Sequence, residues 1–118
     1  MNELKFSISE EKKIFVAGFS GEINPGTEEV FGNHLSLLSD QACEKNKHII
    51  IDFQGLEYIN STGLGVIAQF YKKCSEKKVR VIICGLSSMC SRLFEITKLD
   101  HLFEILPSLN DARSALSC

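Results

Sequence analysis

Two neighbouring hydroxyls, Ser61 and Thr62, are the residues whose types and spacing best fit a chemical role. They follow Asn60 and precede Gly63, shortly after an apolar run, as expected where a helix begins at a turn. Asn60 or Ser61 can cap such a helix, and the free backbone N–H groups of its first turn favour an anion. The pair therefore fits either a modifiable site or two residues that only cap a helix, and both interpretations stay open.

Motifs of known catalytic centres do not occur in the sequence. It contains no GxSxG elbow, no GxxxxGK[ST] loop, no GxGxxG after the first strand and no HExxH pair. The five cysteines form no CxxC pair, so we expect reduced thiols and neither a metal site nor a redox centre. We therefore expect a protein that is not an enzyme and that uses no cofactor.

Length and composition predict one globular domain over residues 1–118, with 44% hydrophobic and 24% charged residues. The 13 basic and 15 acidic residues are scattered, with no basic stripe for nucleic acid. The start of the chain lacks the apolar core of a signal peptide, and no apolar run approaches the roughly 20 residues that span a bilayer. We expect a cytoplasmic protein that binds neither nucleic acid nor membrane.

Hydrophobic periodicity predicts alternating strands and helices. The short polar turn at 10–13 favours an antiparallel hairpin, and Thr27 and Ser87 or Ser88 are candidate helix caps. The result is an α/β fold, with a mixed sheet of four to five strands, an antiparallel edge and about four helices. Strands are expected near 4–8, 14–23, 48–53, 79–84 and 102–106, and helices from 27, over 62–78, from 87 or 88 and over 109–116.

The inward faces of two helices can be read from the spacing of apolar residues. Val66 and Phe70 lie opposite the main stripe of the helix at 62–78. We expect both to be at least partly exposed to a partner, and burial against a neighbouring helix is the alternative. The predicted inward residues are Leu64, Ile67, Ala68, Tyr71 and Cys74 in this helix, and Met89, Leu93 and Ile96 in the next.

Three separated segments resemble one known family. Residues 51–53 followed by 58–66 closely resemble the phosphorylation-site segment of bacterial anti-sigma factor antagonists, which are STAS domains. Residues 21–24 resemble the family's Gly-Glu-aliphatic-Asp segment, and residues 93–105 resemble its C-terminal helix and strand. The resemblance covers nearly the whole chain, in the family's order.

This resemblance implies a non-catalytic switch. The unphosphorylated protein would bind a serine kinase that otherwise sequesters a sigma factor, phosphorylation would release it, and a PP2C-type phosphatase would restore binding. The family's phosphorylated hydroxyl corresponds to Ser61 or Thr62, of which we favour Ser61. The predicted partner-binding residues are Asn24, Asn60, Gly63 and Leu64 in the resembling segments, together with Val66 and Phe70 from the helix face described above.

Asn24 and Asn60 depart from the family, because acidic residues usually stand at both positions. The loss of two negative charges favours an alternative, a phosphorylation-independent STAS scaffold or a regulatory module for a transporter or signalling complex. A phospho-accepting receiver at Asp52 is a weaker alternative, because the first strand lacks the acidic pair that would bind magnesium.

Overall fold

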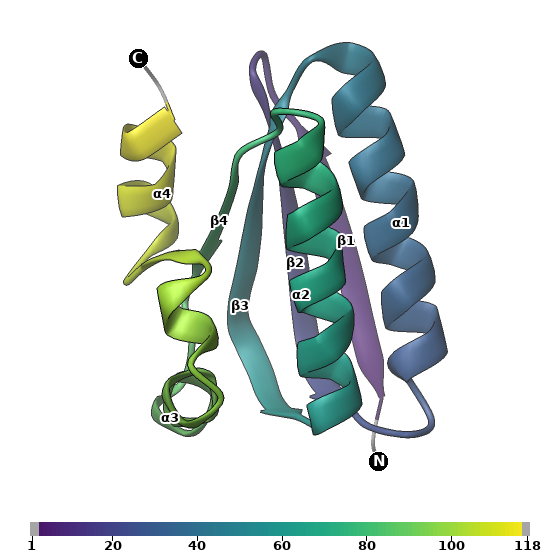
Figure 1. The fold of residues 1–118 in the computed structure, drawn as a ribbon, viewed down its shortest axis with the longest axis vertical. Helices are drawn as coiled ribbons and strands as arrows, with labels where there is room; N and C mark the ends of the chain where they lie inside the picture. The colour runs from purple at the N-terminus through teal and green to yellow at the C-terminus, as the bar shows by residue number, and fades with distance from the viewer. Residues whose placement is uncertain (1–2, 117–118) are drawn as a thin grey trace.

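The computed structural model describes residues 3–116 as five strands in one sheet with four α-helices and one short 3-10 helix. The spatial order of the strands is β1-β2-β3-β4-β5, so β3 is central, as predicted. Figure 1 shows the sheet with its helices. The strands are β1 (Leu4–Glu10), β2 (Ile14–Ile23), β3 (His48–Ile59), β4 (Val81–Cys84) and β5 (Glu104–Leu106).

The sheet is mixed, as the sequence predicts. The turn between β1 and β2 is short and those strands pair antiparallel, whereas β2, β3, β4 and β5 pair parallel through helical connections. The carboxyl ends of the parallel strands therefore meet at one edge of the sheet.

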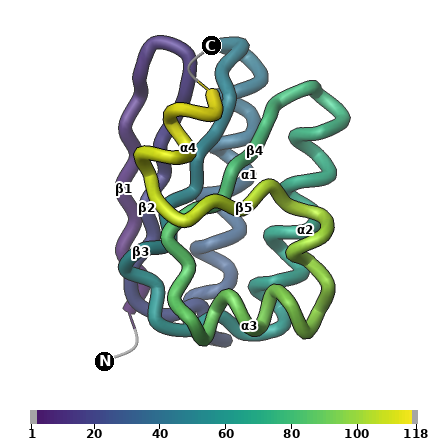
Figure 2. Tube along the Cα trace, turned by 90° about the vertical axis from the view of Figure 1, so that its left-hand side faces the viewer, coloured from purple at the N-terminus to yellow at the C-terminus, as the bar shows by residue number. Residues whose placement is uncertain are grey.

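Helices cover both faces of the sheet, in unequal amounts. α1 and α2 pack side by side on one face, and α4 lies on the other face over β3, β4 and β5 (Figures 1 and 2). The helices are α1 (Glu28–Lys45), α2 (Ser61–Glu76), α3 (Ser88–Ile96) and α4 (Leu109–Leu116), with the 3-10 helix η1 at Leu99–His101. Between residues 3 and 116, no helix has the length and apolarity needed to cross a membrane.

The main core lies between the sheet and α1 and α2. Its centre is aromatic, with the Phe19 ring 5.0 Å from the Phe31 ring and 5.9 Å from the Phe53 ring. Burial of such rings is a principal source of folding free energy. A smaller cluster under α4 contains Ile14, Val16, Ile50, Ile82, Cys84, Ala112 and Leu116.

The predicted end of the central strand at Gln54–Gly55 is wrong, because β3 continues to Ile59. The register against β2 shifts in this region instead of breaking. Gly55 permits this close approach, since a Cβ there would lie 2.6 Å from Cβ of Ser20. In the sequence this glycine suggests a turn, but in the structure it lies at an irregularity within the strand.

The predicted inward face of α3 is wrong at two of its three residues, since only Leu93 packs partly buried against the core. Met89 and Ile96 are 58% and 68% exposed, whereas Cys90 and Phe94 are fully buried. Cys90 and Phe94 are four residues apart and share one helix face, so the helix is rotated by about one residue from the predicted orientation. The phenylalanine ring, larger than the aliphatic alternatives, occupies the core position.

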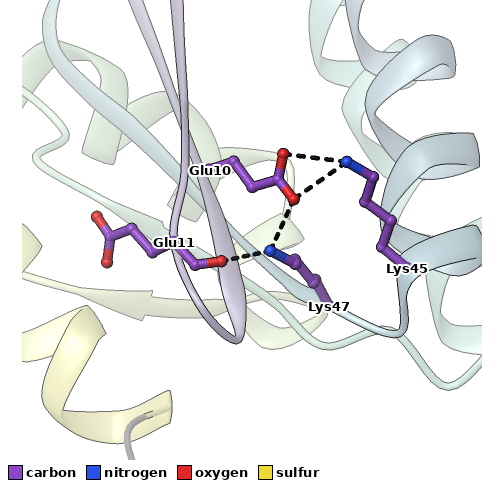
Figure 3. A network of polar contacts seen from close by, with 4 residues as sticks. All are labelled: Glu10, Glu11, Lys45 and Lys47. Atoms are coloured by element: carbon purple, nitrogen blue, oxygen red, sulfur yellow. Dashed lines mark hydrogen bonds and ion pairs between the residues drawn. The ribbon is translucent and has the colours of Figure 1, made fainter.

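Charged contacts close the opposite end of the sheet, where the parallel strands begin (Figure 3). Nζ of Lys45 lies 3.1 Å from Oε1 of Glu10, and Nζ of Lys47 lies 2.8 Å from Oε2 of the same side chain. Lys47 also donates to the backbone carbonyl of Glu11. These contacts tie the β1–β2 turn to the connection between α1 and β3.

Candidate functional site

The two asparagines singled out in the sequence lie side by side at the carboxyl edge of the sheet. Ile23 ends β2 and Ile59 ends β3, and the two residues are paired in the parallel register. Asn24 and Asn60 follow directly, and the backbone N–H of Asn60 donates to the carbonyl of Ile23 at 3.0 Å. We refer to the ends of these strands and the starts of α1 and α2 as the carboxyl edge.

Asn60 is the residue that caps α2, which resolves the choice between Asn60 and Ser61. Its backbone is extended and its Oδ1 accepts from the backbone N–H of Gly63 at 2.8 Å. Its Nδ2 donates to Oε2 of Glu28, at the start of α1, at 3.0 Å. One side chain therefore caps α2 and links it to α1.

Ser61 and Thr62 are the first two residues of α2, and both are exposed. Within residues 3–116 neither hydroxyl has a hydrogen-bond partner, because Asn60 already serves as the cap. The expected position of Ser61, accessible at a helix start, is confirmed. The structure therefore leaves both hydroxyls available to an external group.

Asn24 organises the turn between β2 and α1. Its Oδ1 accepts from the N–H of Gly26 at 2.9 Å, and its Nδ2 donates to Oε1 of Glu22 at 3.4 Å. Thr27 does not cap α1 with its side chain, contrary to the sequence prediction. Its hydroxyl instead donates to the carbonyl of Glu22 at 2.8 Å and accepts from the N–H of Asn24 at 3.0 Å.

Two carboxylates at the carboxyl edge were missed by the sequence analysis. Glu22 accepts from the Asn24 amide and Glu28 accepts from the Asn60 amide. An aspartate at position 24 or 60 would place a second negative charge at hydrogen-bonding distance from a glutamate, which is unfavourable. The carboxyl edge therefore still contains acidic groups, because a glutamate lies beside each asparagine. Sequence spacing gave no signal for the contact between residues 28 and 60.

Gly63 is required by close packing. A Cβ on this residue would lie 2.6 Å from Cγ2 of Ile23 and 2.9 Å from Cγ1 of Ile59. These are the last residues of β2 and β3, so the first turn of α2 rests directly on the strand ends. Gly63 and Leu64 are both buried, and they position the site without being available for direct contact with a partner.

The expected exposure of Phe70 is wrong. This side chain is 5% exposed and belongs to the main core, and Val66 is partly buried against the same core. Phe70 is buried against a neighbouring helix, which was the alternative that the sequence left open. α1 packs along this side of α2, where Cγ1 of Val66 lies 3.8 Å from the Cβ position of Gly32.

The other chemically notable side chains do not join this site. Asp52 lies on the sheet face that α4 covers, since it shares the alternation of Ile50, and its Oδ1 accepts from the N–H of Gln54 at 3.0 Å. Burial raises the pKa of Cys84 to about 12 and that of Cys74 to about 11, so both thiols are protonated at neutral pH.

Among the described residues, no three histidine, cysteine or acidic side chains are grouped to hold a metal ion. Cys43, Cys74, Cys84 and Cys90 are free thiols, whereas Cys118 lies outside the described residues.

The fold and the site define a small α/β domain with an exposed hydroxyl pair at the start of a helix. The family model described as "STAS domain" matches residues 5–112. The chain belongs to the STAS domain family, as the resemblance of its motifs indicated.

Named relatives agree with this assignment. The chain is 24% identical to an anti-sigma F factor antagonist of Paenibacillus polymyxa over 116 residues. The aligned part covers 97% of this chain and 93% of the relative. It is 40% identical over 55 residues to an anti-sigma-B factor antagonist of Listeria monocytogenes, about 47% of this chain and 48% of the relative. These are names of regulators, in agreement with the non-enzymatic class expected from the sequence.

Solved structures share the fold. An anti-sigma factor antagonist from Mycobacterium paratuberculosis superposes with a TM-score of 0.87 at 21% identity, covering 99% of this chain and 97% of that chain. The Bacillus cell fate determinant SpoIIAA, solved in its phosphorylated form, superposes with a TM-score of 0.68 at 18% identity, covering 94% and 98%. At these identities the likeness establishes the fold.

Proposed function

We propose that this protein is an anti-sigma factor antagonist whose carboxyl edge binds an anti-sigma factor serine kinase. Phosphorylation of Ser61 or Thr62 releases the kinase, and a PP2C-type phosphatase restores binding. The observation that carries the proposal is the pair of exposed, unpartnered hydroxyls at the start of α2. The names of the relatives and the family membership support the same function.

Ser61 is the favoured phosphorylation site, following the resemblance of residues 58–66 to the family's segment. Thr62 is also exposed and lies one position further into the helix. Since Asn60 carries the cap, modification of either hydroxyl leaves the hydrogen bond between Asn60 and Gly63 in place. Phosphorylation is therefore expected to change the surface and leave the helix intact.

Charge at the carboxyl edge determines what a phosphate does there. The helix dipole and free N–H groups of α2 favour an anion by about 0.3–1 kcal/mol at an exposed site. Glu28 opposes this gain, because its carboxylate is held close by through Asn60. The net effect on folding is small, whereas burying a group of charge about −1.5 to −2 against a partner costs several kcal/mol unless a cation meets it.

The test is a binding titration with the cognate anti-sigma factor serine kinase and nucleotide. We compare wild type, Ser61→Ala, Ser61→Asp, Thr62→Ala and the phosphorylated protein by calorimetry, with thermal melts of each. Ser61→Ala should bind and resist release by ATP, and phosphorylation should weaken binding by about 100-fold or more, equivalent to about 3 kcal/mol, without lowering the melting temperature.

Ser88→Asp is the matched control, because Ser88 is also an exposed hydroxyl at the start of a helix, α3. It should leave binding unchanged. Equal affinity for wild type, Ser61→Ala and the phosphorylated protein would refute the switch.

The second candidate is a phosphorylation-independent scaffold or a regulatory module for a transporter or signalling complex. The specific observation in its favour is that amides occupy positions 24 and 60, where the family usually has acids. Incubation with kinase and ATP separates the two functions. Stoichiometric modification at Ser61 or Thr62 supports the switch, and no modification of a protein that still binds its partner supports the scaffold.

A further inference from the structure

The outer edge of β1 presents unpaired backbone groups. β1 is the first strand in the sheet order, and within residues 3–116 no strand lies on its outer side. The N–H of Glu22 donates to the carbonyl of Glu3 at 3.0 Å, and β1 pairs antiparallel with β2 in a continuous register. Because hydrogen-bonded and non-bonded pairs alternate, the even-numbered residues of β1, including Leu4, Phe6 and Ile8, direct their N–H and C=O groups outwards.

One stripe of α1 runs along this edge. Val30, His34 and Leu37 are spaced i, i+4 and i+7, so they share a helix face. The His34 ring stacks on the Phe6 ring at 4.0 Å between centroids, which places the stripe on the β1 side of α1. Val30 is 48% exposed and Leu37 is 59% exposed. We call this strip of α1, with Leu4, Phe6 and Ile8, the β1–α1 edge.

The β1–α1 edge is complementary to itself. Leu4 and Ile8 lie two residues on either side of Phe6 in the strand. Val30 and Leu37 lie about one turn on either side of His34, which packs on Phe6. The two apolar sets therefore share one centre, and they extend over similar lengths, about 13 Å along the strand and about 10 Å along the helix.

A two-fold axis that passes next to Phe6 and is perpendicular to the sheet brings the β1–α1 edges of two copies into contact. Leu4 of one copy then faces Ile8 of the other, and Phe6 faces Phe6. These residues have outward-directed backbone groups, so they can form hydrogen-bonded antiparallel pairs. The two α1 helices lie antiparallel on the same side of the joined sheet, with Val30 against Leu37 of the other copy.

Charge is compatible with self-association. Lys5 is the single charged residue between Leu4 and Ile8, and the two-fold axis places it opposite Ser7 of the other copy. No charged residue lies between Val30 and Leu37. Glu10, the charged residue that ends β1, is already paired with Lys45. In this arrangement no two like charges face each other across the interface. Charged side chains on edge strands are a usual obstacle to edge-to-edge pairing.

We propose that the β1–α1 edge is a homodimer interface that joins two sheets into one ten-stranded sheet. A strip about 23 Å long and about 20 Å deep buries on the order of 1,000 Å² in total, at the low end for specific association. A dissociation constant on the order of 10 μM is expected for an interface of this size.

The dimer leaves the start of α2 free. α2 packs on the other flank of α1, where Val66 approaches Gly32, so Ser61 lies away from β1. One dimer can therefore present two copies of the hydroxyl pair at once. Dimerisation is independent of the proposed switch, and a Ser61→Asp variant should dimerise like the wild type.

The test is sedimentation of wild type and variants over about 1 to 300 μM, with circular dichroism to verify folding. Wild type should change from monomer to dimer over this range. Val30→Lys and Leu37→Glu should each weaken dimerisation by at least 10-fold, and the double variant should restore it, because each lysine then faces a glutamate of the other copy. Ile8→Lys tests the strand separately and should also favour monomer.

Ile96→Glu is the matched control, since Ile96 is 68% exposed on α3 and lies outside the interface. It should dimerise like the wild type. A wild type that stays monomeric at every concentration overturns the proposal. A dimer that Ile96→Glu weakens but Leu37→Glu does not also overturns it, as does a double variant that fails to restore association.

Discussion

The two ends of the parallel sheet differ in how their polar groups are used. At the amino end, Glu10 is paired with Lys45 and Lys47, so the prominent charges satisfy one another (Figure 3). At the carboxyl edge, Ser61 and Thr62 have no partner within the described residues. Exposed ion pairs contribute little to stability. The unpartnered hydroxyls at the start of α2 can still form hydrogen bonds with an external group. The difference indicates which end is available to a partner.

The carboxyl edge depends on the core directly beneath it, and the largest expected effect tests that support. Phe70→Ala removes a ring from the packing between α2 and α1 and should lower the free energy of unfolding by about 3–5 kcal/mol. Urea denaturation measures the change. Gln69→Ala, at an exposed neighbour in the same helix, should shift stability by no more than about 0.5 kcal/mol.

This result would also separate packing from recognition. A Phe70→Ala protein with unchanged stability but weakened kinase binding would contradict the burial of Phe70 and return it to the partner surface. Phe70→Asp should unfold the protein, since it adds a buried charge to the same cavity.

The contact between helix start and strand ends can be tested at intermediate magnitude by two glycines of α2. Gly63→Ala pushes a methyl group against Ile23 and Ile59 and should cost about 1–3 kcal/mol. Gly65→Ala, where the added Cβ would point into open space away from other parts of the fold, should stabilise by about 0.5–1 kcal/mol through helix propensity.

Thermal melts of both glycine variants provide the measurement. Similar effects of the two substitutions would show that α2 does not rest on the strand ends as described.

The smallest expected effect is at the amino end. Hydrogen bonds from Lys47 and then Lys45 lower the pKa of Glu10 below its ordinary value of 4.5. A lowered folded-state pKa contributes stability above the unfolded-state pKa, and that stability is lost as the pH falls through the folded-state value. Glu10→Gln should therefore differ from wild type slightly at neutral pH, and the two should converge as the pH falls through the lowered folded-state pKa of Glu10.

Denaturant midpoints at several pH values measure this convergence, and added salt should reduce the neutral-pH difference. A difference that grows as the pH falls would contradict the ion-pair assignment. Lys12→Gln is a suitable control, because Lys12 is an exposed residue of the same turn and makes no contact with Glu10.

The sequence by itself determined the element order, the hydroxyl pair and the family. Strand and helix periods differ, so alternation and i, i+4 spacing are visible without a structure. The segment at 58–66 also carries its own cap and turn residues, which is why the start of α2 was predicted closely. Local chemistry was sufficient for these features.

The tertiary structure alone decided which apolar residues are buried and which polar groups meet. Phe70 and Met89 were assigned to the wrong surface, because helix spacing shows a face but not which neighbouring element covers it. The contact between Asn60 and Glu28 joins residues 32 positions apart, and it arises because parallel strands bring two helix starts to one edge. Such contacts depend on the packing of the whole sheet, which no local pattern encodes.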